Sequence, residues 1–392
     1  MSTIVTSTSP AAPTGTAAIH AGWPSATAVA AVTAELRRRP PLVAYADCAA
    51  LTGRLARVAD GGGHVLQAGD CAELFAEVSA AGTARKIVQL HDLASAVTRA
   101  TRVPVVRIGR LAGQFAKPRS RATVPGPGGE PLPAYRGDAV NDLVPTPAAR
   151  TPDPRRMLTA YDRSAEVLGH LAGGPIYTSH EALLCEYEEA LARLDPATGV
   201  RYGSSAHLLW VGDRSRQVDG PHVDLLARVA NPVAVKLGPT ATAHDVAALV
   251  ERLDPDRAPG RLVLVARLGA GAVVDLLPPL VEAARTGGAR PVWLCDPMHA
   301  NTVSTPDGRK TRPVDDVVRE VTGFVGVLRA AGVHPGGLHL ETSPDDVTEC
   351  VEARADLPAA AALPRYRTAC DPRLNPGQAR RVVEAFVREV TR

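Results

Sequence analysis

Residues 232–266 of the chain read PVAVKLGPTATAHDVAALVERLDPDRAPGRLVLVA, and this segment has the pattern of a strand, a helix and a second strand. PVAVKL (232–237) and RLVLVA (261–266) are short, rich in β-branched residues and apolar almost throughout. Strands that are buried on both faces of a parallel sheet have such sequences. The intervening TAHDVAALVERL (242–253) has the apolar spacing of an amphipathic helix. The segment therefore predicts one β–α–β unit.

The same alternation extends over most of the chain. Six further apolar runs of five or six residues predict strands, and helical patterns separate them. Eight strands that alternate with helices predict an α/β fold, and their number favours a (β/α)8 (TIM) barrel. A doubly wound open sheet has the same local pattern and is the alternative. The further strands are predicted at HVLQA (64–68), VPVVRI (103–108), PIYTS (175–179), AHLLWV (206–211), PVWLC (291–295) and GGLHLE (336–341), and the further helices at 83–100, 162–172, 180–194, 222–230, 272–285, 313–332 and 375–392.

The domain organisation follows from the segments that lack this alternation. Residues 1–22 are rich in Ser, Thr, Ala and Pro and lack the features of a signal peptide, so we expect a short, flexible N-terminal arm. Residues 23–392 are predicted to form a single barrel domain, including an N-terminal helix at 26–38 that packs under the barrel. Residues 121–156 are Pro/Gly-rich and aperiodic, and they predict a long loop after the second strand. Long loops in compact domains tend to be functional.

Composition excludes several classes of protein. The chain has 392 residues, with 44 Lys+Arg against 41 Asp+Glu and 4% aromatic residues. This balance argues against a nucleic-acid-binding protein, which has a strongly basic face or a base-stacking platform. No apolar run is long enough for a transmembrane helix. The six cysteines are unevenly spaced, which favours free thiols in a reducing cytoplasm.

Positively charged residues follow several of the predicted strands. Barrel enzymes build their sites at the carboxyl ends of the strands, so these side chains are expected to converge there. Arg and Lys together favour an anionic ligand, and this number suggests more than one phosphate or carboxylate group. Solvated surface cations are the alternative, and this alternative is strongest for Arg119. The set is Arg110, Lys117, Arg119, Arg214, Lys236 and Arg267.

A second set at the same strand ends has metal-ligand chemistry. Cys71, His299, Glu341 and Asp371 offer sulfur, nitrogen and oxygen ligands, a mixture that suits Mn²⁺, Co²⁺, Fe²⁺ or Zn²⁺. No two of these residues have the short sequence spacing of a local metal motif such as HxxxH. The alternative is therefore a buried cysteine and a hydrogen-bonded histidine without a metal. Asp296, three residues before His299, is placed to orient that ligand.

The order of these motifs resembles the class II (plant-type) 3-deoxy-D-arabino-heptulosonate 7-phosphate (DAHP) synthases, in a compact form. The resemblance runs from about Trp23 to the C-terminus, and its ten ordered blocks are highly specific. The blocks are QAGDCAE (67–73), RLAGQFAKPRS (110–120), YRGDAVN (135–141), TSHEALL (178–184), WVGDRSRQVDGPHV (210–223), NPVAVKLGP (231–239), CDPMHANT (295–302), GGLHLE (336–341), VTEC (347–350) and TACDPRLN (368–375).

The resemblance implies an enzyme with a (β/α)8 barrel. It implies an aldol-type condensation of phosphoenolpyruvate with erythrose 4-phosphate that releases phosphate, in a homodimer. Composition, as argued above, adds a cytoplasmic location and no nucleic-acid or membrane partner. It implies a divalent metal, Mn²⁺ or Co²⁺ with Zn²⁺ and Fe²⁺ as alternatives, on Cys71, His299, Glu341 and Asp371. The implied phosphoenolpyruvate residues are Arg110, Glu181, Asp213, Arg214, Lys236 and Arg267, the implied erythrose 4-phosphate residues are Lys117, Ser120 and Arg214, and the implied catalytic residues are Lys236, Arg267 and Asp213.

Two departures from the family pattern are visible in the sequence. Asp213 stands where the family usually has Glu, which shortens the side chain by one methylene. The segment from Ser120 to Ser179 is short compared with large, regulated members of the family. We therefore expect weak or absent feedback inhibition by Phe, Tyr or Trp, and a role in secondary metabolism. The alternatives are an aminoDAHP synthase of an aminoshikimate pathway, which uses an imino or amino tetrose phosphate, and a non-catalytic regulatory homologue.

Overall fold

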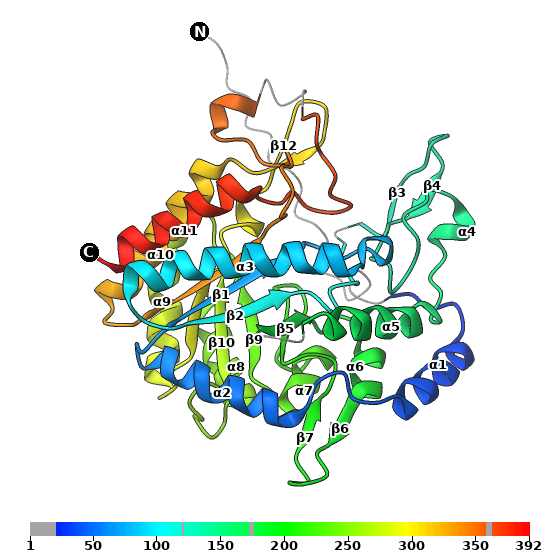
Figure 1. The fold of residues 1–392 in the computed structure, drawn as a ribbon, viewed down its shortest axis with the longest axis horizontal. Coiled ribbons are helices and arrows are strands. Elements are labelled where there is room, and N and C mark those ends of the chain that lie inside the picture. The colour runs from blue at the N-terminus through cyan, green and yellow to red at the C-terminus, as the bar shows by residue number, and fades with distance from the viewer. Residues whose placement is uncertain (1–20, 120, 172–175, 358–362) are drawn as a thin grey trace.

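The computed structural model describes residues 21–119, 121–171, 176–357 and 363–392. Most of the predicted arm (1–22), and Ser120, lie outside these described residues. Eight strands form a closed parallel barrel in chain order (Figure 1). They are β1 (His64–Gly69), β2 (Val105–Arg110), β5 (Ile176–Glu181), β8 (Leu208–Val211), β9 (Val233–Leu237), β10 (Leu262–Ala266), β11 (Val292–Cys295) and β14 (Pro335–Glu341).

The closed barrel confirms the predicted (β/α)8 fold and rules out the open sheet. The predicted strand ranges agree with the observed bounds to within two residues. The pairing of β1 with β14 closes the barrel, and it places Gly69 opposite Glu341 on one side and opposite Arg110 on the other. Because all eight strands are parallel, the residues that follow them meet at one rim.

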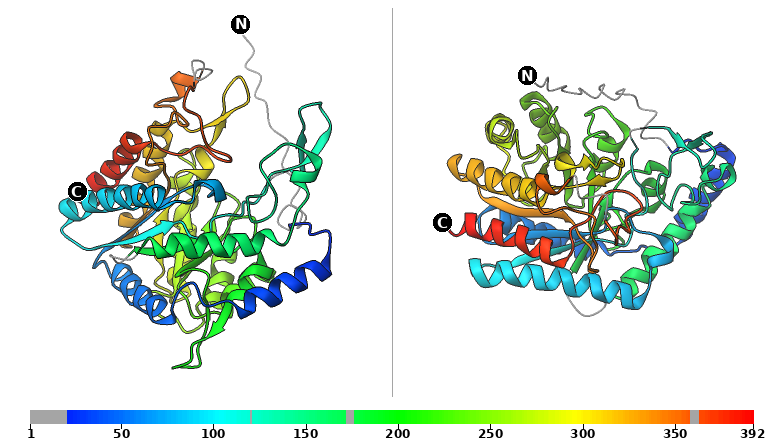
Figure 2. Two further views of the ribbon diagram at one scale, coloured as in Figure 1. Left: turned by 45° about the vertical axis from the view of Figure 1, so that its right-hand side comes forward. Right: turned by 90° about the horizontal axis from the view of Figure 1, so that it is seen from above.

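Helices surround the barrel, as the view from above shows (Figure 2). Short hairpins project from both of its ends, with β6–β7 at the bottom of Figure 1 and β12 and β3–β4 at the top. Among the described residues, no helix combines the length and the apolar character that crossing a bilayer requires. The large helices are α1 (Ala26–Arg38), α2 (Tyr45–Ala59), α3 (Ala80–Thr101), α5 (Arg156–Gly169), α8 (Ala243–Leu253), α9 (Val273–Thr286), α10 (Val314–Ala330) and α11 (Pro376–Val390). The short elements are η2 (Phe75–Glu77), α4 (Pro147–Arg150), α6 (Cys185–Leu191), α7 (Pro221–Ala227), η3 (His299–Asn301) and the strands β3 (Thr123–Pro125), β4 (Pro131–Pro133), β6 (Ala192–Leu194), β7 (Arg201–Gly203), β12 (Val303–Ser304) and β13 (Lys310–Thr311).

Two predictions about helices are wrong. The helix predicted at 180–194 is only the short α6, because β5 continues to Glu181 opposite Trp210 and because 192–194 pair with β7. The predicted helix at 26–38 exists as α1, but it packs against α5 and α6 on the side of the barrel.

A second N-terminal helix, α2, closes the bottom of the barrel instead. Its Leu51, Leu55 and Val58 are buried in the same apolar cluster as the barrel-interior residues of the strands. The backbones approach closely there, since a Cβ on Gly260 would lie 2.1 Å from the carbonyl oxygen of Thr52. The three- and four-residue spacing of these apolar residues was the sequence signal for this helix.

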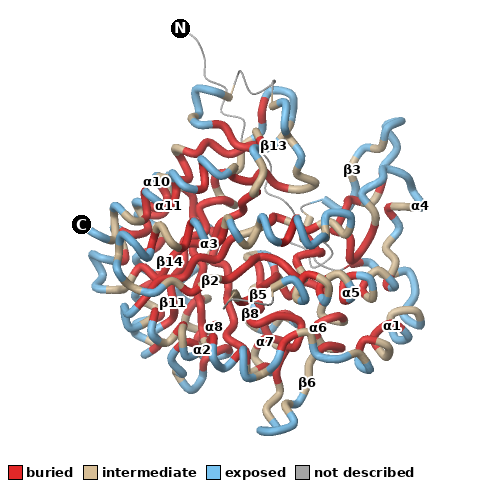
Figure 3. The backbone as a smooth tube through the Cα atoms, in the orientation of Figure 1, coloured by how far each residue is buried: buried red, intermediate tan, exposed pale blue. Residues whose placement is uncertain are grey.

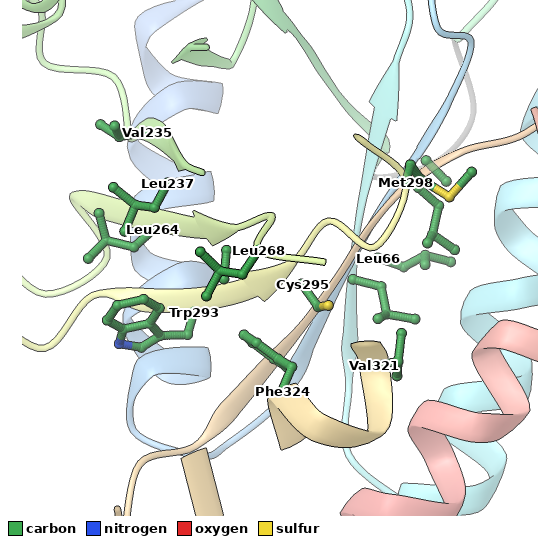
Figure 4. Packing of buried hydrophobic residues seen from close by; sticks show 14 of the residues in the cluster. Leu66, Val235, Leu237, Leu264, Leu268, Trp293, Cys295, Met298, Val321 and Phe324 are labelled. Atoms are coloured by element: carbon green, nitrogen blue, oxygen red, sulfur yellow. The ribbon is translucent and has the colours of Figure 1, made fainter. Parts of the chain in front are cut away.

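The two-residue period of the strands separates two cores. Outward-facing side chains such as Leu264 and Trp293 belong to the same buried cluster as Phe324 of α10, and Figure 4 shows part of this layer. Inward-facing residues form the second core, and the buried strands stand out in Figure 3 against exposed hairpin tips. Toward the carboxyl rim the inward series changes from apolar to charged, as when Lys236 follows Ala234 after two positions. The inward-facing positions of each strand are therefore apolar inside the barrel and polar at its carboxyl rim.

Candidate active site

A cavity of about 450 Å³ opens at the carboxyl rim of the barrel. It receives side chains from the ends of β5, β8, β9, β10 and β11 and from the loops that follow β2 and β14. Eight of the twelve residues predicted for the site line it: Lys117, Glu181, Asp213, Arg214, Lys236, Arg267, His299 and Asp371. The cation Arg119 also lines it.

Three of the predicted metal ligands form a compact group below this cavity. Ligand atoms of Cys71, Glu341 and Asp371 all lie within 4.8 Å of one another, and all three residues are buried. The fourth, His299, lies beside them, with its Nε2 atom 3.1 Å from Oε1 of Glu341. We call these four residues the ligand cluster. Residues 300 positions apart in the sequence, Cys71 and Asp371, thus come within 3.6 Å between Sγ and Oδ2.

Positive charge surrounds the ligand cluster. The ammonium of Lys117 lies 3.0 Å from Sγ of Cys71, 3.1 Å from Asp371 and 3.4 Å from Glu341. Arg312, with no exposed side-chain surface, contacts the other carboxylate oxygen of Glu341 at 2.8 Å. Burial alone would raise the pKa of Glu341, but His299, Lys117 and Arg312 hold that pKa well below its usual value. The carboxylate is therefore kept ionised.

The chemistry of the ligand cluster fits a divalent cation. It combines a thiol, an imidazole and two carboxylates, the mixed set that borderline divalent ions accept. Burial, a hydrogen bond with Cys370 and the charge of Glu341 raise the pKa of Cys71 well above its usual value. A bound divalent cation has the opposite effect on a thiol, since it stabilises the thiolate.

Asp296 joins the ligand cluster to Lys236. Its Oδ2 atom accepts from Nζ of Lys236 and from Nδ1 of His299, both at 2.7 Å, and the residue has no exposed surface. The contact with His299 is the one expected from the sequence, and it turns Nε2 toward Glu341. Burial lowers the pKa of Lys236, and the attraction of Asp296 only partly offsets this. Lys236 is thus a cation that loses its proton more readily than an ordinary lysine.

Asp213 is fully engaged by neighbouring donors. One oxygen accepts from the backbone N–H of Gly238 at 2.8 Å and from Arg216 at 3.0 Å, and the other pairs with Arg267 at 3.0 Å. The carboxylate therefore fixes the guanidinium of Arg267 at the cavity wall. Asp213 also lines the cavity, and the catalytic role expected from the sequence stays a prediction.

The remaining predicted residues differ in their access to the cavity. Arg110 is 2% exposed and lies below the cavity, where it donates to the carbonyl oxygen of Asp70 and to Glu341. Glu181 lines the wall, and a Cβ on Gly212 would lie 2.3 Å from its Oε1, so a larger residue at 212 would displace the Glu181 carboxylate. Ser120 lies outside the described residues.

Three polar residues of the cavity wall were not predicted from the sequence. Arg121 and Thr302 line the cavity, and so does Lys310, whose ammonium lies 2.6 Å from Oδ1 of Asp371. Lys310 lies in the β12–β13 hairpin rather than at the end of a barrel strand. A prediction based on the residues that follow each barrel strand therefore does not include it. The basic pair Arg309–Lys310, separated by six residues from the CDPMHANT block, was the available signal.

The fold and the site together define a class of enzyme. A parallel barrel whose rim carries a cation-lined cavity beside a metal-ligand cluster suits a small anionic substrate and metal-assisted chemistry.

Comparison with known proteins identifies the family of the chain. A model of the class-II DAHP synthetase family matches residues 12–174 and 170–386. A phospho-2-dehydro-3-deoxyheptonate aldolase of Streptomyces coelicolor is 41% identical over 411 residues, covering 91% of this chain and 91% of that protein. A probable phospho-2-dehydro-3-deoxyheptonate aldolase of Pseudomonas fluorescens is 44% identical over 364 residues, with 90% of each chain covered. The chain therefore belongs to the class-II DAHP synthetase family, and it has the DAHP synthase activity for which that family is named.

A solved structure is similar in fold. The phospho-2-dehydro-3-deoxyheptonate aldolase from Francisella tularensis SCHU S4 matches with a TM-score of 0.55, covering 92% of this chain and 96% of that one. At 10% sequence identity, this similarity concerns the barrel fold alone. Enzymes of the class-II family depend on a divalent metal in general, and the ligand cluster agrees with that dependence.

Proposed function

We propose that the rim cavity binds phosphoenolpyruvate and erythrose 4-phosphate side by side and joins them into DAHP with release of phosphate. The observation that carries this proposal is the composition of the cavity wall. It combines the cations Lys236, Arg267 and Arg214 with the ligand cluster and Lys117. An anionic enol donor and an aldehyde acceptor need these two environments next to each other.

Phosphoenolpyruvate is assigned to the part with Lys236, Arg267 and Arg214. Its carboxylate and phosphate carry the negative charges that Arg and Lys side chains hold best. Asp213 keeps Arg267 in place through the 3.0 Å ion pair, and Glu181 lies on the same wall. Arg110 acts from below through its contact with Glu341.

Erythrose 4-phosphate is assigned to the part with Lys117, Ser120 and Arg214. Arg121 and Lys310 line the same cavity and extend this positive surface. Two cationic regions in one cavity match two phosphorylated substrates, and the aldehyde end of the sugar phosphate then faces the ligand cluster. The reacting carbons are held together, so their encounter becomes effectively intramolecular.

We assign the metal to Cys71, His299, Glu341 and Asp371, with Mn²⁺ or Co²⁺ as the ion. When bound there, a divalent ion supplies Lewis-acid polarisation of the aldehyde carbonyl. Asp296 fixes the ring of His299, and Arg312 fixes Glu341. Lys236 and Arg267 orient the water that adds to C2 of the enol donor, and the lowered pKa of Lys236 suits proton transfer there.

The biological setting is a further part of the proposal. The excursion after β2 contains only the β3–β4 hairpin and the four-residue α4 before α5, among the residues that the structure describes. Such a compact segment supports an enzyme that Phe, Tyr and Trp do not inhibit and that serves secondary metabolism, and membership of the family supports a homodimer.

The experiment that tests the assignment follows phosphoenolpyruvate consumption by chelator-treated protein. We expect turnover only with erythrose 4-phosphate and only after Mn²⁺ or Co²⁺ is added back, with no effect of aromatic amino acids. Cys71→Ala should abolish this recovery, whereas Cys185→Ala, on the outer helix α6, should not. Full metal-independent activity of Cys71→Ala would overturn the metal assignment.

A further inference from the structure

A buried ion-pair cluster lies directly behind the ligand cluster and outside the cavity wall. Arg373 contacts Asp70 at 2.8 Å through one terminal nitrogen. Its other terminal nitrogen lies 2.9 Å from Glu349, and its Nε lies 3.1 Å from the other oxygen of the same carboxylate. The residues are 8%, 1% and 0% exposed, in the order Arg373, Asp70 and Glu349. We call these three residues the Arg373 clamp.

Two residues of the clamp lie next to metal ligands in the sequence. Asp70 directly precedes Cys71, and Arg373 follows Asp371 by two residues. The 2.8 Å ion pair is thus a direct side-chain link between the two loops that carry these ligands. Glu349 fixes the loop backbone as well, because it accepts from the backbone N–H of Arg373 at 2.8 Å.

The other end of the clamp is anchored in regular structure. The second oxygen of Asp70 contacts the ammonium of Lys86 at 2.5 Å, and Lys86 stands in α3. The backbone N–H of Leu374, next to Arg373, donates to the backbone carbonyl oxygen of Glu341 at the end of β14, at 3.0 Å. The clamp and its neighbour Leu374 therefore fix the loops of Cys71 and Asp371 relative to α3 and β14.

This arrangement has an energetic reason. Anionic groups at Cys71, Glu341 and Asp371 repel one another when they are brought within a few ångströms. A fork-shaped guanidinium between two carboxylates is the strong, directional contact that opposes such repulsion. We propose that the Arg373 clamp is a positioning device that holds Cys71 and Asp371 at the spacing a divalent cation needs, and that Arg373 sets the affinity of the site for metal. This inference rests on the metal assignment of the proposed function.

The test measures metal binding directly in the full-length protein after chelator treatment. Co²⁺ is titrated in, and thiolate-to-cobalt charge-transfer absorption reports ligation by Cys71. Arg373→Lys keeps the charge but loses the fork, and Glu349→Gln weakens the fork while leaving the ion pair with Asp70. We expect Co²⁺ affinity to fall by about 10- to 100-fold in both variants. At saturating Co²⁺, turnover should return toward the wild-type kcat.

A matched control separates this effect from a general loss of ion pairs. Arg381 also contacts two carboxylates, Asp315 and Glu352, but lies on the exposed side of α11. Arg381→Gln should bind Co²⁺ as the wild type does. Wild-type affinity and spectrum in Arg373→Lys and Glu349→Gln would overturn the clamp, and so would a failure of both variants to fold, which would make it part of the folding core. Absence of Co²⁺ binding in the wild type would instead overturn the metal assignment itself.

Discussion

A substitution at Gly238 is expected to lower the catalytic rate while leaving the free energy of unfolding nearly unchanged. A Cβ at this position would lie 2.2 Å from Oδ2 of Asp213 and 2.7 Å from a terminal nitrogen of Arg267. Ordinary contact begins at 3.4 Å, so the carboxylate would have to retreat by about 1 Å. Both groups are ends of flexible side chains, and the backbone can therefore stay in place. Gly238→Ala should disrupt the Asp213–Arg267 pair without unfolding the barrel.

The expected loss follows from this displacement. A misplacement of about 1 Å in an orienting group costs about 10²-fold in rate, which corresponds to about 2.7 kcal/mol. The loss should fall on kcat/KM for phosphoenolpyruvate, because Arg267 is assigned to that substrate. The free energy of unfolding should stay within about 1 kcal/mol of the wild type, since alanine also restricts the unfolded chain.

The assay is the initial rate of phosphoenolpyruvate loss, with each substrate varied in turn, beside thermal denaturation. Gly271→Ala is the matched control, because a Cβ there has no neighbour within 4 Å in the described structure. Equal kcat/KM values for Gly238→Ala and Gly271→Ala would refute the reasoning, since the Asp213–Arg267 pair would then contribute nothing to turnover.

Two further predictions concern stability. Arg102, exposed at the end of α3, adopts a left-handed backbone conformation with φ of 60°, so Arg102→Gly should raise the free energy of unfolding by about 0.5–1 kcal/mol. Arg99→Gly, inside the same helix, should lower the free energy of unfolding by about 1 kcal/mol. A loss of stability in both variants, measured by urea denaturation, would contradict this prediction. Burial raises the pKa of Glu320 from 4.5 to about 7, even though the backbone N–H groups of Leu268 and Gly269 donate to it. The folded protein then holds a proton that the unfolded chain has released, so stability falls as pH rises from 4.5 to 7, by about 3 kcal/mol relative to Glu320→Gln. A pH-independent difference between the two proteins would show that Glu320 is ionised throughout this range.

The barrel was predictable because its strands are buried on both faces. Runs such as RLVLVA and PVAVKL face helices on one side and the barrel interior on the other, so they are apolar at nearly every position. Helix α2 was missed because the one helix predicted before β1 was placed at 26–38, although Leu51, Leu55 and Val58 have helical apolar spacing. The helix predicted at 180–194 failed because strand pairing of Glu181 and of 192–194 overrode a good helical pattern.

The rim residues were partly predictable for the same reason. The last inward position of a strand opens onto the cavity, so charged residues there, such as Lys236, stand out from the sequence. Lys310 reaches the cavity from a hairpin, and no strand-end rule includes it. The Arg373 clamp joins residues that are 303 positions apart, and neither spacing nor periodicity predicts such a contact. The engagement of Asp213 by three donors is likewise a property of the folded loops.

A hydrogen-bonded belt inside the barrel explains how a charged rim coexists with an apolar floor. Gln67 donates to Ser179 at 2.9 Å and contacts His339 at 2.7 Å, and His339 in turn contacts the guanidinium of Arg110. Burial, together with the charges of Lys236 and Arg110, lowers the pKa of His339 well below its usual value, so its ring is neutral and accepts from Arg110. A charged ring would instead repel both cations. Because His339 is a neutral acceptor, it receives the guanidinium of Arg110 inside the barrel without adding a further positive charge beneath the rim.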